Sequence, residues 1–208
     1  MIEPFVLIPY VAIVMGFVFI PGPATLLTVA RATSSGTRAG IATGVGVAMG
    51  DMIHTLMAII GISAIIGTSA LLFSIIKYTG AAYLIYLGIT AILQKVPSDL
   101  NRGRVPITAR AAFRQAVLAE MLNPKTALFF LAFLPQFVQP ENGAVPMQLA
   151  LLGLIFVALG LLSTLVFALG AGRLGTILRR NPSMLKRQGK VVGSIYVALG
   201  ARLALQER

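Results

Sequence analysis

The chain has 208 residues, of which 57% are hydrophobic and only 11% are charged, whereas soluble domains carry about 25% charged residues. A composition this apolar, with a mean hydropathy of +0.90, excludes a soluble fold and indicates a protein that lies in the bilayer. The formal net charge of +11 would suit a nucleic-acid-binding protein, but the basic residues lie in short loops between apolar runs, which is typical of membrane proteins.

Six apolar stretches predict transmembrane helices, because each approaches the roughly 20 residues that cross a bilayer. A single bent region over residues 40–93 is the alternative to separate second and third spans. The first stretch has no Lys or Arg before Arg31, so it lacks the positive region of a cleavable signal and is expected to be retained. We therefore expect an all-α polytopic membrane protein, with residues 1–208 as one transmembrane domain. The spans cover residues 4–20, 40–66, 70–93, 116–138, 146–171 and 191–205.

The first span ends in the motif Pro21-Gly22-Pro23. Each proline lacks an N–H and clashes with the carbonyl four residues earlier, so the carbonyls of Phe17 and Phe19 lose their helical partners. Unpaired backbone at membrane depth is tolerated only inside protein or against a water-filled cavity. The motif therefore predicts either a broken helix that lines a substrate path or a cytoplasmic turn after the first span, and one motif can serve both roles.

The second span carries a carboxylate, Asp51, near its middle, and His54 follows three residues later on roughly the same helix face. Intramembrane carboxylates are costly and usually mark ion or substrate pathways. Asp51 is thus a candidate to bind an ammonium or a proton, and a structural pair with His54 or Lys125 is the alternative. His54 is expected to be packed and hydrogen-bonded. Because the chain has one histidine and no cysteine, we expect neither a metal nor a cofactor.

The fourth span contains Asn123-Pro124-Lys125, preceded by the carboxylate Glu120. Asn is a favoured N-cap and Pro a favoured first helical residue, so a helix is predicted to begin at Pro124, inside the membrane. Its N-terminal dipole would suit a carboxylate. A lysine is unfavourable there, and Asp51, Glu120 or a substrate carboxylate would offset its charge. The alternative is that Lys125 extends to the cytoplasmic surface.

The basic residues predict the orientation of the chain. Thirteen of the 17 Lys and Arg residues lie in or beside the connections 32–39, 94–115 and 172–190, whereas residues 1–3, 67–69 and 139–145 contain none. By the positive-inside rule, the first set of connections is cytoplasmic and both termini face out. Arg202 and Arg208 run mildly against this assignment.

Internal similarity suggests that the chain is a repeat. Two halves of three spans each, at about 1–93 and 116–208 and joined by the basic cytoplasmic loop 94–115, would form a 3+3 inverted repeat with proline-broken first and fourth helices. Such repeats place a substrate site at their interface. Chance similarity in a chain rich in small residues is the alternative. The matches are Lys77, Gly80 and Tyr83 with Lys190, Gly193 and Tyr196, and Phe19-Ile20-Pro21 with Phe133-Leu134-Pro135.

These motifs together resemble the LysE/RhtB family of bacterial amino-acid exporters. The resemblance rests on Pro21-Gly22-Pro23, the Gly-rich segment 40–51, KYTGAAYLIYLG at 77–88 and LNPKTALFF at 122–130 with PQF at 135–137, and it is clear over about residues 5–140. It implies export of lysine, threonine, homoserine, homoserine lactone or a related compound across the cytoplasmic membrane, driven by protons. Glu120 and Ala116 depart from the Asn and Gly that are frequent in the family, which leaves the substrate open.

We therefore expect a secondary transporter that exports an amino acid or derivative by proton antiport, in the inner membrane of a bacterium. Substrate contacts are assigned to Asp51, Glu120, Asn123, Pro124 and Lys125, with Pro21, Gly22 and Pro23, and proton coupling to Asp51 and Glu120. The expected partners are the amino acid, protons and the bilayer, and a homo-oligomer is left open. A passive channel and a membrane-embedded structural or enzymatic subunit are the alternatives, although no catalytic motif supports an enzyme.

Overall fold

The computed structural model describes residues 2–19, 22–68, 70–93 and 106–180, and, near the C-terminus, residues 190, 193–194, 197–198, 200–201 and 204–205. Within this part of the chain all regular structure is helical and there are no strands, which confirms the all-α prediction. The helices are α1 (Pro4–Phe19), α2 (Pro23–Ser35), α3 (Thr37–Thr68), α4 (Ala70–Leu93), α5 (Ala109–Met121), α6 (Pro124–Leu128) and α7 (Val145–Arg180). Between α6 and α7 lie a π-helical turn, η1 (Phe129–Phe133), and two 3-10 turns, η2 (Leu134–Phe137) and η3 (Pro140–Asn142).

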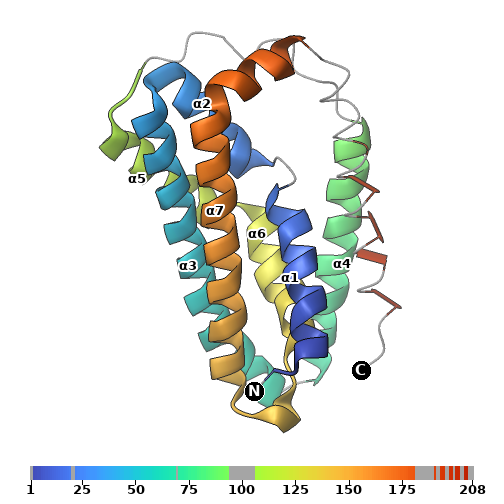
Figure 1. The fold of residues 1–208 in the computed structure, drawn as a ribbon. Helices are drawn as coiled ribbons and strands as arrows, with labels where there is room; N and C mark the ends of the chain where they lie inside the picture. The colour runs from blue at the N-terminus through green and yellow to red at the C-terminus, as the bar shows by residue number, and fades with distance from the viewer. Residues whose placement is uncertain are drawn as a thin grey trace.

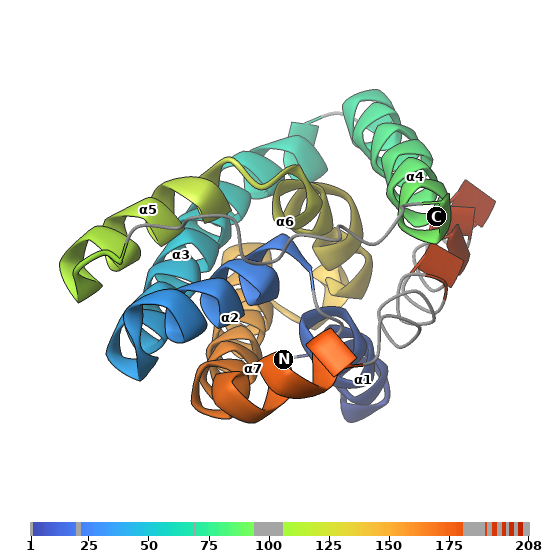
Figure 2. The same ribbon diagram turned by 90° about the horizontal axis from the view of Figure 1, so that it is seen from above.

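The long helices α3 and α7 lie side by side and run in opposite directions along the bundle (Figure 1). The shorter α2 and α5 pack against one end of this pair, and α1 packs on α7 toward the other end. Helix α4 stands to one side, where it contacts η1, as the view from above shows (Figure 2).

Two single helices are long and apolar enough to cross a membrane, namely the Thr37–Gly61 part of α3 and the Val145–Ala171 part of α7. Two bent pairs, α1 with α2 and α5 with residues Pro124–Phe137, also qualify when each pair counts as one span. The described residues thus hold two to four candidate spans, as expected of a polytopic membrane protein. Helix α4 matches the predicted stretch 70–93, but the stretch 191–205 is described only in part, so the total of six remains a prediction.

Several predicted boundaries were wrong, for local reasons. The first helix resumes at Pro23 and continues to Ser35, because a proline is well tolerated in the first turn of a helix. The loop predicted over residues 32–39 shrinks to Gly36, whose φ of 89° suits glycine. The helix of the predicted fourth span begins at Ala109, before position 116, since the side chain of Thr108 accepts a hydrogen bond from the nitrogen of Ala111.

The two bent pairs are alike, which is compatible with the predicted repeat. The bend is 46° between α1 and α2 and 45° between α5 and the helix that begins at Pro124. However, the helices resume at Pro23 and Pro124, 101 positions apart, and not at the offset of 113 or 114 in the sequence matches. Pro135, the sequence counterpart of Pro21, lies in η2. Pro21 and Tyr196 lie outside the described residues, and the inverted repeat remains a prediction.

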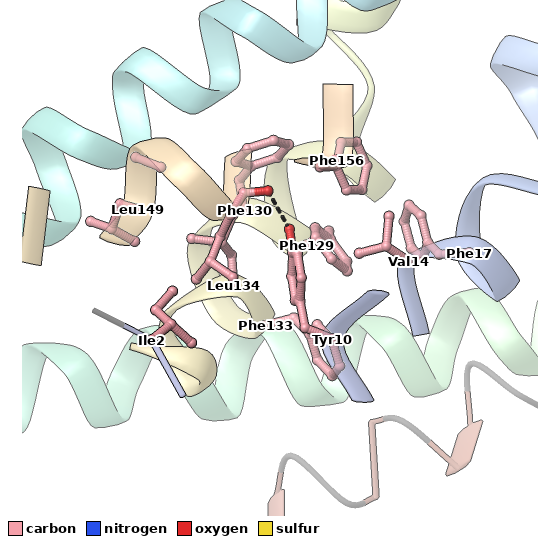
Figure 3. Packing of buried hydrophobic residues seen from close by; sticks show 12 residues of the cluster. Ile2, Tyr10, Val14, Phe17, Phe129, Phe130, Phe133, Leu134, Leu149 and Phe156 are labelled. Carbon is pink, nitrogen blue, oxygen red and sulfur yellow. Dashed lines mark hydrogen bonds between the residues drawn. The ribbon is translucent and has the colours of Figure 1, made fainter. Parts of the chain in front are cut away.

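An aromatic cluster fills the space between α1, η1 and α7 (Figure 3). The rings of Phe17 and Phe129 lie 4.7 Å apart, and those of Phe129 and Phe156 are separated by the same distance. Tyr10 is fully buried, and its hydroxyl donates a hydrogen bond of 2.7 Å to the carbonyl of Leu152. The cluster thus packs the part of the bundle that lies away from α2 and α5.

Candidate functional site

The end of α1 has carbonyl groups that its own helix leaves unpaired. Pro21, four residues after Phe17, has no N–H to donate to the Phe17 carbonyl. The ammonium of Lys125 donates to that carbonyl at 3.4 Å, and it also lies 3.9 Å from the centre of the Phe17 ring. The hydroxyl of Ser163 on α7 donates to the Val18 carbonyl at 2.7 Å. Side chains from two other helices therefore hold the first break.

The second break has the predicted N-cap. The side-chain oxygen of Asn123 accepts a hydrogen bond from the backbone nitrogen of Lys125 at 3.1 Å, and Pro124 is the first residue of α6. The side-chain nitrogen of Asn123 donates to Oε1 of Glu120 at 3.0 Å, and the Thr126 hydroxyl donates to the same oxygen. Because Asn123 already caps α6, the positive charge that this break offers comes mainly from the side chain of Lys125.

The carboxylate of Asp51 enters the same region from α3. Asp51 is 2% exposed, and its Oδ1 has no hydrogen-bond partner among the described residues. A Cβ added at Gly160 on α7 would lie 3.2 Å from Oδ2, so the glycine leaves room for the carboxylate. The Asp51 carboxyl interacts electrostatically with Glu120 and Lys125. A buried acceptor without a donor costs free energy, which makes Asp51 Oδ1 the clearest free acceptor for a ligand in this region.

A pocket that is partly open to the outside lies between these groups, and its empty space together with the solvent at its mouth is about 420 Å³. Its walls come from both breaks, from the start of α2 at Pro23 and Thr25, and from α3 and α7. Apolar walls with a few converging polar groups are typical of small-molecule sites. The polar side chains in its wall are those of Thr25, Asp51, Glu120, Asn123, Lys125, Thr126 and Thr164.

Most of the residues singled out in the sequence meet at this pocket. Gly22, Pro23, Asp51, Glu120, Asn123 and Lys125 line it, while Pro124 begins α6 beside it. A Cβ at Gly22 would lie 3.1 Å from the Lys125 ammonium, so the first break makes room for the cation of the second. Lys125 therefore points into the protein rather than toward a membrane surface. Pro21 lies outside the described residues.

Two kinds of site residue were missed. Thr25 and Thr164 are almost fully buried and line the pocket, and Phe17 and Phe156 form part of its apolar wall. For Thr164 the sequence held a signal, because Ser163-Thr164 is a polar pair within a long apolar run. His54 does not line the pocket. Its Nε2 lies 3.0 Å from the Glu120 carbonyl, so the predicted packed and hydrogen-bonded histidine is confirmed.

Comparison with known proteins assigns the chain to a family. The model of the LysE type translocators matches residues 15–207. An uncharacterized membrane protein of Vibrio cholerae is 32% identical over 94% of both chains. Another, from Bacillus subtilis, is 33% identical over 96% of this chain and 98% of its own length. The homoserine/homoserine lactone efflux protein of Salmonella typhimurium is 29% identical over 88% of both chains.

No solved structure matches the chain significantly. The family match covers both helix breaks, Asp51 and the described length of α7. It also agrees with the motifs on which the sequence resemblance rested. The chain is therefore a multi-pass membrane protein that belongs to the LysE type translocators.

Proposed function

We propose that the chain is a secondary transporter that exports an amino acid or a close derivative from the bacterial cytoplasm in exchange for protons. The observation that carries the proposal is the pairing of opposite charges in one pocket. Asp51 offers a carboxylate oxygen without a partner, and Lys125 offers an ammonium. An amino acid carries the complementary pair, an ammonium and a carboxylate, on one carbon. The name of the Salmonella typhimurium relative, a homoserine/homoserine lactone efflux protein, supports this substrate class.

The roles follow from the positions of the charges. Asp51 accepts the substrate ammonium, while Lys125, held by the break at Asn123-Pro124, binds the carboxylate. Gly22 and Pro23 shape the wall opposite Lys125. Because the aromatic cluster fills the other side of the breaks, the substrate enters from the side of α2. The positive charge of the basic connections supports a cytoplasmic location for that side.

Proton coupling is assigned to Asp51 and Glu120. The two carboxyls interact in a buried setting, and among the described residues of the pocket wall one ammonium, that of Lys125, lies near them. Two neighbouring buried carboxylates repel each other, so one proton bound between them lowers the free energy of the site when no substrate is bound. A substrate ammonium supplies the same positive charge as the proton. Proton and substrate therefore compete for binding at the two carboxyls, and exchange requires such competition.

Export by cells tests this proposal. Cells that express Asp51→Asn or Lys125→Ala should lose resistance to a toxic load of the exported amino acid, while protein levels in the membrane stay normal. Lys77→Ala is the matched control, because Lys77 also lies in a predicted span near an aromatic ring, but on α4 and away from the pocket lining. Normal resistance with both site variants would refute the assignment.

The driving force needs a separate measurement. Export against a concentration gradient should stop when an uncoupler collapses the proton gradient. Continued uphill export in the presence of the uncoupler would contradict proton exchange. Movement that only follows the substrate gradient in every condition would instead identify a passive channel.

A further inference from the structure

The proposed function assigns no role to His54. It lies on α3, three residues after Asp51, and is 5% exposed. Its ring stacks on that of Phe130 with centroids 5.8 Å apart and an angle of 22° between the planes. Its Nε2 lies 3.0 Å from the carbonyl oxygen of Glu120. A single side chain thus joins the helix of Asp51 to the last turn of α5.

The Glu120 carbonyl is open to this contact because of Pro124. In a continuous helix, the nitrogen of the residue four positions later donates to each carbonyl. For Glu120 that residue is Pro124, which has no N–H. The nitrogen of Asn123 donates to the carbonyl at 3.0 Å, and His54 Nε2 supplies the second donor. Since a carbonyl only accepts, His54 carries a proton on Nε2 in this contact.

We propose that His54 is a positioning residue that fixes the distance between the two charged ends of the substrate site, an inference that rests on the proposed function. The turn that His54 holds carries Glu120, then Asn123 as the cap of α6, and then Lys125. The helix that bears His54 also bears Asp51. The hydrogen bond therefore keeps the ammonium of Lys125 in register with the carboxylate of Asp51, without a contact between His54 and the substrate.

Substrate affinity gives the first test, with two variants that differ in one donor. His54→Gln keeps a nitrogen donor at nearly the position of Nε2, whereas His54→Met has similar length but no donor. In proteoliposomes, His54→Gln should show a KM for the exported amino acid close to that of the wild type. His54→Met should raise KM about tenfold with little change in the maximal rate. Equal KM values for the two variants would overturn the proposal.

Thermal unfolding in detergent gives a second test that needs no transport. Pro124→Ala restores the N–H that Glu120 lacks, so it should remove the need for the histidine donor. With Pro124 present, His54→Met should melt about 2–4 °C below His54→Gln. In the Pro124→Ala background, His54→Met and His54→Gln should have the same melting temperature. The same difference in both backgrounds would show that His54 does not serve this carbonyl. A wild type that moves no amino acid would refute the proposed function and leave this readout intact.

Discussion

The prolines of the two breaks remove hydrogen bonds inside the helices, and charged or polar side chains replace them from outside. Lys125 binds the carbonyl of Phe17, and His54 binds that of Glu120. Each break is therefore held by a residue of another segment, and Lys125 itself belongs to the second break. Movement of Lys125 toward a substrate would weaken its contact with α1, which links binding at the pocket to the geometry of the first break.

At the residue scale, Glu120 provides a test that separates geometry from proton binding. Glu120→Gln keeps the oxygen that accepts from Asn123 and Thr126 but removes the second carboxyl. We expect exchange of labelled substrate to continue and uphill export driven by a pH gradient to fail, as measured in proteoliposomes.

The control for this test is Glu120→Leu, which removes both the carboxyl and the acceptor. It should destabilise the protein by about 1–3 kcal/mol, because buried donors lose their partner. Uphill export by Glu120→Gln at the wild-type rate would show that Glu120 carries no proton.

The charged site residues could be predicted because charges are rare within spans, and the Asn123 cap because capping is a local property. The polar pair Ser163-Thr164 was a weaker signal, because hydroxyls in membrane helices often bond their own backbone, as Thr164 does with the carbonyl of Gly160 at 3.0 Å. Only the packing of α7 against α3 brings it to the pocket. The role of His54 also depends on a contact between residues 66 positions apart.

At the scale of helices, the glycines of α3 determine how closely α5 approaches the site. A Cβ at Gly50 would lie 2.5 Å from the Cβ of Glu120, which is too close for any real contact, whereas one at Gly61 would meet nothing within 4 Å. The two helices therefore pack closely at Gly50. The substitution Gly50→Ala would push α5, and Glu120 with it, away from Asp51.

Gly50→Ala and Gly61→Ala form a matched pair on one helix. We expect Gly50→Ala to cost about 1–3 kcal/mol through overpacking, which lowers the melting temperature by about 2–4 °C for each kcal/mol. Gly61→Ala should be neutral or slightly stabilising, because alanine favours helix more than glycine does. Thermal unfolding in detergent checks both. Equal melting temperatures would show that α5 does not rest on Gly50.

The continuous helices could be predicted from hydropathy, but the irregular turns and bounds of the broken helices could not. The apolar run predicted α4 at its observed bounds, since nothing polar interrupts it for long. The π-helical turn Phe129–Phe133 has no signal in the local sequence, because it depends on packing with other helices. It places Phe129 and Phe133 in the aromatic cluster with α1 and α7. The extension of α5 back to Ala109 was missed because Arg110 and Arg114 lower the hydropathy of its first turns.

At the scale of the whole molecule, the two ends of the bundle differ in charge. Helix α3 begins at the end where α2 and α5 lie, and α7 begins at the opposite end (Figure 1). The predicted orientation places the first end in the cytoplasm. Because the sequence contains no cysteine, a single introduced cysteine can report its side of the membrane without background.

Thr37→Cys and Ala144→Cys report the two ends, since both positions are exposed. A maleimide that cannot cross membranes should label Ala144→Cys in intact cells and Thr37→Cys only after permeabilisation. The reverse pattern would invert the orientation, and with it the direction in which the pocket opens.

Counterflow of radiolabelled homoserine, threonine and lysine into proteoliposomes tests the charge-paired pocket most directly. The samples are the wild type, Lys125→Met and the control Lys77→Met, each with the same elution profile in detergent. We expect the wild type and Lys77→Met to exchange at least one of these amino acids. Lys125→Met should exchange it about 10- to 100-fold less efficiently, because the substrate carboxylate loses its charged partner. Equal counterflow by the two lysine variants, or no exchange by the wild type, would contradict the site.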